Sequence, residues 1–245
     1  MLKLSELSDG DVAALGDAIV AVTRELGHSM PAPKGAPYYG LDLCLTDPVV
    51  LDAFSQHGIF RKYERAVALG GGLGGVVRWW ATRFGCTVLG VEERASISGV
   101  AAALSARAGL DAQTVFVCGS PSRLPLRSGR FTHAWAVDPL ATAPDADAIL
   151  REILRVLRPG GAVALYLASE REDGRRWTER TRAAGFVSLS LRALPPARQP
   201  QFVQLARRRL RARLEGVAPP LAQAIGELER SEPGGGALLF AQRPS

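Results

Sequence analysis

The sequence predicts an α/β fold with a mostly parallel sheet. From Ala66 onward, short apolar runs alternate with stretches in which apolar residues recur every three or four positions, as in strands joined by crossover helices. The chain has 245 residues, of which 47% are hydrophobic and 22% charged, so it is long enough to bury a large core. Wholesale disorder is not expected from this composition.

The N-terminal part predicts one long helix, then a loop. Ser8 can cap a helix because its hydroxyl can accept a backbone N–H of the first turn. It precedes apolar residues spaced three or four apart, which form one stripe of the helix: Val12, Leu15, Ile19, Val22 and Leu26. The prolines and glycines of MPAPKGAPYYG then break any helix, which places Tyr38 and Tyr39 in a loop. Asp47 begins a short predicted helix, DPVVLDAF, with proline in its first turn.

Five apolar runs in the central part are predicted as strands: AVAL from Ala66, CTVLGV from Cys86, TVFVC from Thr114, THAWAV from Thr132 and AVALYLA from Ala162. Helical patterns lie between them at residues 74–84, 94–108 and 145–157. In the last of these connections, Pro159 stops the helix and the two glycines that follow supply a turn into the next strand.

The C-terminal part predicts two further strands separated by helices. RRWTERTRAAGF is a helix ending at Gly185, and VSLSLRAL is a strand. A helical segment follows Pro195 and Pro196, and GGGALLFAQRPS returns as the final strand. On a helix, one face of the inserted segment would carry Phe202, Ala206, Leu210, Leu214 and Val217, and four arginines largely avoid it: Arg207, Arg208, Arg211 and Arg213. This pattern favours a solvated amphipathic helix over an RNA-binding or membrane-surface helix.

Charge and cysteine content point to no special partner. The net charge of +6 comes from arginine, since lysine occurs only at Lys3, Lys34 and Lys62, and we discount it as a sign of nucleic-acid binding. The cysteines Cys44, Cys86 and Cys118 form no CxxC pair, so neither a disulfide framework nor a zinc site is predicted. The first residues lack a signal-peptide core and no apolar run is long enough to span a membrane, so we expect a soluble, cytoplasmic protein.

A glycine loop follows the first central strand. Gly70, Gly72 and Gly75 match the GxGxxG pattern, and Glu92 lies near the end of the next strand, as in dinucleotide dehydrogenases. Glycines in such loops permit positive φ and let backbone N–H groups approach a ligand, needs that NAD shares with other nucleotides. No GxxxxGK[ST] occurs, which excludes a P-loop.

Three phrases, in order, resemble the class I S-adenosylmethionine (SAM)-dependent methyltransferases: LGGGLGGVVRWWATRFGCTVLGVEE, FVCGSPSRLPLRSGRFTHAWAVD and EILRVLRPGG, the last from Glu152 to Gly161. The small-molecule branch that includes tocopherol, sarcosine and phosphoethanolamine methyltransferases looks closest. It also carries GGxxR, here Gly74, Gly75 and Arg78, and a cap inserted before the last strand. The resemblance implies a Rossmann-like, seven-stranded methyltransferase sheet with N-terminal helices and a helical cap. A dehydrogenase explains none of these phrases.

The resemblance implies SAM as cofactor, cradled by the glycine loop that includes Gly70, Gly72 and Gly74. It also implies acidic contacts at three strand ends, to the methionine amino group, to the ribose hydroxyls and to the adenine amine. These positions are Ala68, Glu92 and Ser120, so only the ribose acid is kept, although the Ser120 hydroxyl can still hydrogen bond. Tyr39, with its neighbour Tyr38, would close over the cofactor or merely pack.

Two residues near the fourth strand are candidates for the chemistry. Asp138 follows this strand beside the expected cofactor crevice, where many amino-methyltransferases hold the substrate amine. Asp138 is either substrate-facing or a helix-cap or loop carboxylate. His133 is a candidate base, but on an alternating strand it shares a face with Phe131 and Trp135, which favours a packed histidine. No metal-ligand constellation is present in the sequence.

These observations predict a SAM-dependent methyltransferase of biosynthesis that transfers a methyl group to a small molecule, with a natural product as one option for this acceptor. The alternative is a methyltransferase-fold protein without methyl transfer, either a cyclase-like SAM-binding enzyme or a non-catalytic partner. The expected units are an N-terminal helical segment and lid at 1–62, a SAM-binding core at 63–195, a cap at 196–236 and a closing strand at 237–245. No nucleic-acid or membrane partner is expected, and a homodimer is left open.

Overall fold

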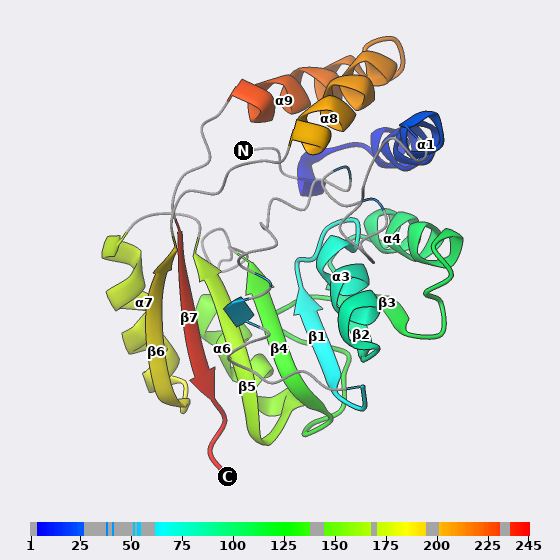
Figure 1. Ribbon diagram of the computed structural model, residues 1–245. Coiled ribbons are helices and arrows are strands. Elements are labelled where there is room, and N and C mark those ends of the chain that lie inside the picture. Colours follow the sequence, from blue (N-terminus) through cyan, green and yellow to red (C-terminus); the bar gives the residue numbers. More distant parts are fainter. Residues whose placement is uncertain are drawn as a thin grey trace.

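The computed structural model describes residues 4–26, 38, 41, 51, 53–54, 62–137, 145–167, 171–194, 201–230 and 236–245. Within these residues seven strands form one sheet in the order β3-β2-β1-β4-β5-β7-β6, as Figure 1 shows. Neighbouring strands from β1 to β5 are parallel, whereas β7 is antiparallel to both β5 and β6. The strands are β1 (Arg65–Leu69), β2 (Thr87–Glu92), β3 (Thr114–Cys118), β4 (Phe131–Val137), β5 (Leu157–Leu167), β6 (Val187–Leu194) and β7 (Gly236–Gln242).

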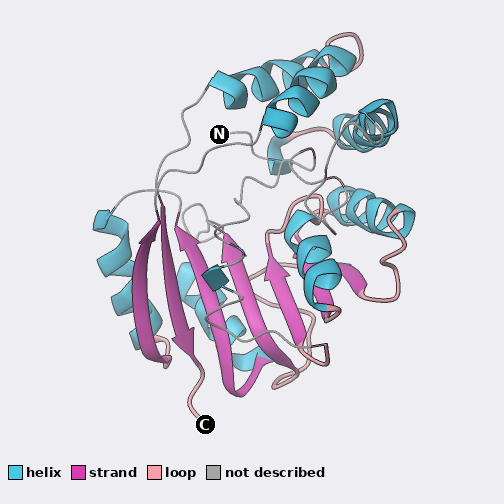
Figure 2. Cartoon of the chain, in the orientation of Figure 1, coloured by secondary structure: helices cyan, strands magenta, loops and turns pink. Residues whose placement is uncertain are grey.

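Helices cover both faces of this sheet and lie beyond the carboxyl ends of its parallel strands (Figure 2). They are the 3-10 helix η1 (Leu4–Glu6) and the α-helices α1 (Asp9–Leu26), α3 (Gly75–Phe84), α4 (Ala95–Arg107), α6 (Ala146–Val156), α7 (Arg171–Ala183), α8 (Gln201–Leu214) and α9 (Pro219–Arg230). The predicted fold, a mostly parallel methyltransferase-type sheet with a helical insert before the last strand, is confirmed.

The sheet is apolar on both faces. Successive side chains of a strand point in opposite directions, so a continuous apolar run supplies apolar side chains to each face. In β1, Val67 and Leu69 belong to a cluster packed on α6 and α7, while Ala66 and Ala68 belong to a second cluster packed on α3. From Ala66 to Leu69, β1 is therefore an unbroken apolar run, as expected for a parallel strand covered on both sides.

Strand β5 begins earlier than the sequence indicated. The helix before it ends at Val156, and Leu157 already pairs with Phe131 of β4. The next registered pair is His133 with Ala162, so β5 advances five residues while β4 advances two. The extra residues, around the Pro159 and Gly160 turn, bulge out of the ladder, and Gly160 has a φ of 71°.

A third apolar cluster joins segments that are far apart in the sequence. It includes Val12, Leu15, Ile19 and Val22 of α1, Ala206, Leu210 and Leu214 of α8, Leu221 and Ile225 of α9, and Ile97 and Leu104 of α4. Figure 1 shows α1, α8 and α9 gathered above the carboxyl ends of the parallel strands. The N-terminal helix and the late insert thus form one cap.

The start of α1 is capped as the sequence predicted. The Ser8 hydroxyl accepts the N–H of Asp11 at 3.1 Å, and the Asp11 carboxylate accepts the N–H of Ser8 at 3.2 Å. This reciprocal pair fixes the first turn of the helix. The predicted DPVVLDAF helix lies largely outside the described residues, but Leu51, Ala53 and Phe54 are helical and buried.

Two expectations for the insert were wrong. Val217 is 70% exposed, because α8 ends at Leu214 and the helical face does not continue to it. Arg207 is only 5% exposed, so it lies on the buried side of α8, beside Val203 and Ala206. Long arginine side chains can pack their methylene groups against apolar surface, which a simple polar-face reading overlooks.

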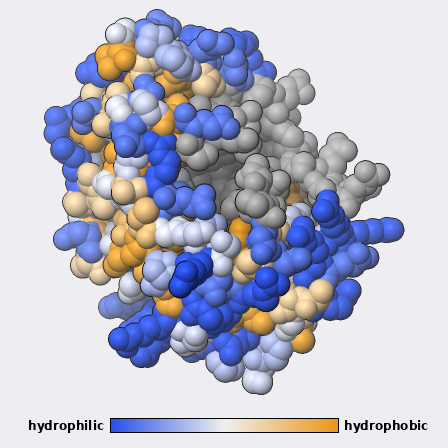
Figure 3. Space-filling model, turned by 180° about the vertical axis from the view of Figure 1, so that it is seen from behind, coloured by the Kyte–Doolittle hydropathy of each residue, from blue (hydrophilic) through white to orange (hydrophobic). Residues whose placement is uncertain are grey.

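The face of the molecule seen from behind is largely polar (Figure 3). Viewed from behind, hydrophilic residues cover much of the molecule, and hydrophobic residues lie mainly along one side (Figure 3). Among the described residues, none of the helices combines the length and the apolar character that crossing a membrane requires. Cys86 is a buried free thiol and Cys118 an exposed one, and Cys44 lies outside the described residues.

Candidate functional site

The glycine loop connects the carboxyl end of β1 to α3. Gly70, Gly72 and Gly74 have φ values of 67°, 57° and 87°, a region that side chains disfavour. The N–H of Gly70 donates to the carbonyl of Val91 at 3.1 Å, which ties the loop to β2. A Cβ on Gly74 would lie 2.8 Å from the Phe116 ring, so glycine is required there by space as well as by conformation.

Glu92, the last residue of β2, reaches across to this loop. Its Oε1 accepts the N–H of Gly72 at 2.5 Å. Burial raises the pKa of the Glu92 carboxyl to about 8, the Gly72 N–H opposes this shift, and the negative charge of Glu93 adds to it. The two predicted site residues are therefore in direct contact, and the acid is in an environment that favours its neutral form.

The start of the described chain lies against the same loop. Cδ1 of Leu4 is 3.0 Å from the point where a Cβ on Gly72 would lie. Arg94, two positions after Glu92, donates from Nη1 to the carbonyl oxygen of Leu4 at 3.2 Å. The same guanidinium also binds the Leu7 carbonyl and pairs with the carboxylate of Asp9. No sequence pattern predicted these contacts, because they join residues far apart in the chain.

Arg78 supports the loop from beneath. Its side chain is fully buried on α3, and Nη1 donates to the carbonyl of Leu73 at 2.7 Å and to the hydroxyl of Ser105 at 3.4 Å. The guanidinium carbon lies 5.5 Å from the centre of the Tyr38 ring, within cation–π range. The GGxxR phrase was the sequence signal for this residue, and its arginine holds the glycine loop together.

The two positions without the implied acids have different surroundings. Ala68 is fully buried and belongs to the cluster under α3. Ser120 is exposed after β3, and its hydroxyl lies 2.9 Å from that of Ser122. A carboxylate at position 68 would thus enter an apolar core, whereas one at position 120 would face solvent.

His133 lies in the core, away from the carboxyl end of its strand. It is 4% exposed and stands four positions before Val137, the last residue of β4. Nδ1 lies 2.9 Å from the Thr132 hydroxyl, and the ring meets that of Phe54 edge-on at 6.0 Å. This position favours packing over catalysis for His133.

The expected shared face of His133 was wrong in one respect. Phe131 packs in the cluster on α6 and α7, while Trp135 packs in the cluster on α3. The two residues lie on either side of an irregularity, because the register between β4 and β5 shifts between Phe131 and His133. Asp138 and Tyr39, the other two predicted site residues, lie outside the described residues.

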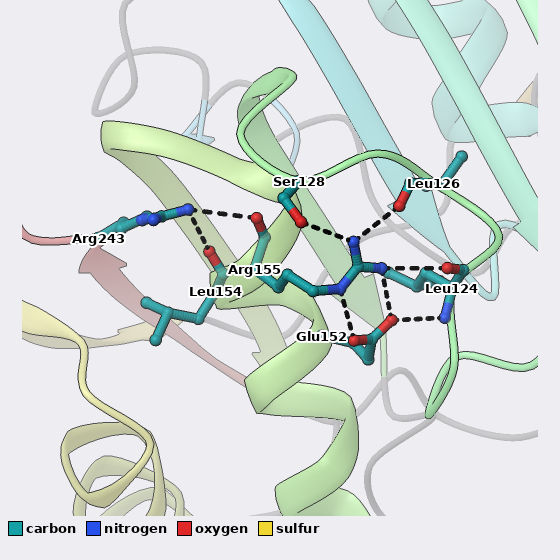
Figure 4. A network of polar contacts seen from close by, with 7 residues as sticks. All are labelled: Leu124, Leu126, Ser128, Glu152, Leu154, Arg155 and Arg243. Carbon is teal, nitrogen blue, oxygen red and sulfur yellow. Dashed lines mark hydrogen bonds and ion pairs between the residues drawn. The ribbon is translucent and has the colours of Figure 1, made fainter.

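The phrase EILRVLRPGG has a structural role at the amino ends of β4 and β5, at the opposite end of the strands from the glycine loop. Figure 4 shows its polar contacts. Arg155 binds both carboxylate oxygens of Glu152 at 2.7 Å and donates to the carbonyls of Leu124 and Leu126 at 3.1 and 2.7 Å. Glu152 also accepts the N–H of Leu124 at 2.7 Å. The Arg155 guanidinium holds the pKa of the Glu152 carboxyl below its ordinary value. Two of the resembling phrases are thus one hydrogen-bonded unit.

A surface hollow of about 440 Å³ lies at this same edge, lined in part by Arg151, Arg155 and Arg243. Two of these arginines are already engaged: Arg155 binds Glu152, and Arg243 donates to the last carbonyls around the end of α6, including that of Leu157 at 2.5 Å. The hollow is remote from the glycine loop, and we assign it no catalytic role. In the described part of the chain, no group of three or more histidine, cysteine or acidic side chains could hold a metal ion.

Comparison with known proteins agrees with this geometry. Residues 67–165 match the family described as "Methyltransferase domain". "Methyltransferase GfsG" of Streptomyces halstedii is 30% identical over 130 residues, covering 49% of this chain and 47% of that protein. "Tocopherol O-methyltransferase, chloroplastic" of Arabidopsis thaliana is 26% identical over 129 residues, covering 53% of this chain and 34% of that protein. The chain thus spans about half or less of the length of these relatives.

Solved structures share the fold over most of the chain. The [4+2]-cyclase SpnF superposes with a TM-score of 0.62 at 21% identity, covering 96% of this chain and 94% of that one. Phosphoethanolamine N-methyltransferase 2 of Haemonchus contortus superposes with a TM-score of 0.59 at 17% identity, covering 98% of this chain and 61% of that one. The resemblance to the class I SAM-dependent methyltransferases is confirmed.

Proposed function

We propose that this chain, whose residues 67–165 form a methyltransferase domain, is a SAM-dependent methyltransferase acting on a small molecule. The observation that carries the proposal is the contact between Glu92 and Gly72 at the carboxyl ends of β1 and β2. Ligands of open α/β sheets bind at this edge. A loop of positive-φ glycines beside a strand-end carboxylate suits a nucleoside, because it offers N–H donors to one part and an acceptor to the hydroxyls of another.

The residues present fit SAM at this site. Gly70, Gly72 and Gly74 would border the cofactor with backbone unobstructed by Cβ atoms, and the Glu92 carboxylate would accept from the two ribose hydroxyls. Ser120 would lie toward the adenine. Bound SAM would supply an electrophilic methyl group on its sulfonium. The chain's own contribution would be to hold the acceptor in line with that methyl and to keep water out.

The acceptor would enter beneath the cap formed by α1, α8 and α9, which lies above the carboxyl ends of the parallel strands. We keep Asp138 as the proposed substrate-facing group and Tyr39 as a proposed cofactor contact. The relative named for tocopherol supports a small, hydrophobic acceptor of a biosynthetic reaction. A cytoplasmic location, the absence of a nucleic-acid partner and the division at residues 62, 195 and 236 remain parts of this proposal.

The second candidate is a SAM-binding protein that transfers no methyl group. The missing acids at Ala68 and Ser120 favour it. The fold that this chain shares with the [4+2]-cyclase SpnF is compatible with it. In that case the cofactor would be a structural part of the site. The intact loop and Glu92 are common to both candidates, so cofactor binding alone does not separate them.

Calorimetric titration of SAM and S-adenosylhomocysteine tests the binding site. Glu92→Ala should weaken binding about 10- to 100-fold, because it removes a charged acceptor worth about 1.5–3 kcal/mol. The control is Asp111→Ala, which removes an exposed carboxylate ahead of β3 and should leave affinity within about twofold. Absence of heat and of thermal shift at millimolar ligand would refute the proposal.

Isotope transfer separates the two candidates. With methyl-tritiated SAM and a panel of phenolic, sterol-like and amine acceptors, a methyltransferase should place label in an extractable product and be inhibited by S-adenosylhomocysteine. A SAM-binding protein that transfers no methyl group should leave the label in SAM. If such a protein catalyses another reaction, such as a cyclisation, S-adenosylhomocysteine should support that reaction as well as SAM does.

A further inference from the structure

Leu4 occupies space next to the glycine loop. Its Cδ1 lies 3.0 Å from the position of a Cβ on Gly72, a glycine with a φ of 57°. The absence of a side chain at such a glycine is what lets a ligand come close to the backbone. The Leu4 side chain fills part of that gap.

The backbone N–H of Gly72, the glycine next to Leu4, is also hydrogen bonded within the protein. The N–H of Gly72 is donated to Glu92 at 2.5 Å, so the acid implied for the ribose faces the loop itself. A nucleoside that uses both groups therefore has to compete with two contacts of the protein, one apolar and one polar.

Arg94 keeps Leu4 in this place. It immediately precedes α4 and is joined to η1 and the start of α1 through the carbonyls of Leu4 and Leu7 and the carboxylate of Asp9. Hydrogen bonds from a charged guanidinium are stronger than those between neutral groups. The arginine side chain is 24% exposed, so these bonds form at the edge of the structure rather than in its core.

We propose that Arg94 is a positioning residue that holds Leu4 over Gly72, and that the cofactor binds by displacing Leu4. This inference rests on the proposed function for the identity of the ligand, which is SAM or S-adenosylhomocysteine. If Leu4 covers Gly72 in most molecules, only the remaining fraction can bind the cofactor, and the apparent dissociation constant is the intrinsic one divided by that fraction. Loosening Leu4 should therefore raise the affinity.

Binding of SAM to two variants tests the proposal. Leu4→Ala removes the covering side chain, and Arg94→Met removes the donors while keeping the length of the side chain. Each should lower the dissociation constant for SAM by about threefold or more and raise the association rate constant. Matched controls are Leu205→Ala on α8, where the leucine is 47% exposed, and Arg107→Met at the other end of α4. Unchanged or weaker binding in Leu4→Ala would overturn the proposal.

Hydrogen exchange of residues 4–9 provides a readout that needs no ligand. Without SAM, Arg94→Met should exchange faster in this segment than wild type and Arg107→Met do. With SAM, the wild-type segment should also exchange faster, whereas increased protection would show that Leu4 covers the bound ligand and would overturn displacement. If wild type binds no SAM, the proposed function fails, and exchange in the free protein still decides whether Arg94 holds the segment. Asp9→Asn serves if Arg94→Met does not fold.

Discussion

The carboxylate of Glu92 accepts the backbone N–H of Gly72 at 2.5 Å, which joins the end of β2 to the loop that follows β1. This contact brings together the two elements that a nucleoside would bind. It also determines how the site should respond to pH, because burial raises the pKa of Glu92 to about 8.

SAM binding should be coupled to release of a proton. In the proposed site the ribose hydroxyls would donate to Glu92 and would therefore favour its carboxylate, whereas burial in the protein without SAM raises the pKa of this carboxyl to about 8. Affinity should rise by up to about tenfold per pH unit between about pH 6 and 8 and then level off. Calorimetry in buffers of different ionisation enthalpy counts the protons released. Glu92→Gln should show a flat profile, and an equally flat wild-type profile would contradict the prediction.

The same carboxyl should make the free protein less stable as pH rises. The unfolded group titrates near 4.5 and the folded group near 8, so between these values the folded state holds a proton that the unfolded state has lost. Stability then falls with rising pH through this window, by at most about 1.4 kcal/mol per pH unit, and levels above it. Urea unfolding at several pH values measures this slope. Glu92→Gln should reduce it, and an identical slope in both proteins would argue against a buried, neutral Glu92.

Restoring the two missing acids one at a time should have opposite effects. Ser120→Asp places a carboxylate on an exposed loop, so we expect an unchanged melting temperature and SAM binding tightened by up to about tenfold. Ala68→Asp would bury a carboxylate in the cluster under α3 and should cost about 2–7 kcal/mol of folding free energy. Ser122→Asp is the control for charge alone. A stable Ala68→Asp protein with tighter binding would mean that position 68 still faces the cofactor.

Arg155 should matter for stability and not for the cofactor. Arg155→Met breaks the bonds to Glu152, Leu124 and Leu126 and leaves a partly buried carboxylate without its partner, so the free energy of unfolding should drop by about 2–4 kcal/mol. SAM affinity of the folded protein should stay within about twofold, since this network lies at the other edge of the sheet. Arg151→Met, at a side chain 63% exposed, is the control and should cost little. A large loss of SAM affinity in Arg155→Met would show that the two edges are coupled.

Much of the fold was determined by the local pattern of the sequence. The strands TVFVC and VSLSLRAL appear with the predicted bounds, and Ser8 caps α1 as expected, because burial periodicity and side-chain capping act over a few residues. The glycine loop and Glu92 were also found from the sequence, since the conformations and charges that they supply belong to the residues themselves.

Tertiary structure decided which distant segments meet. Periodicity gave α8 an apolar face but not the end of the helix, so Val217 is exposed and Arg207 is buried. That α1 and the late insert form one cap, and that Arg94 brings Leu4 to Gly72, depends on the order of strands and on packing across the sheet edge. These contacts join residues as many as 90 positions apart, whose proximity is set by the fold as a whole and leaves no trace in local spacing.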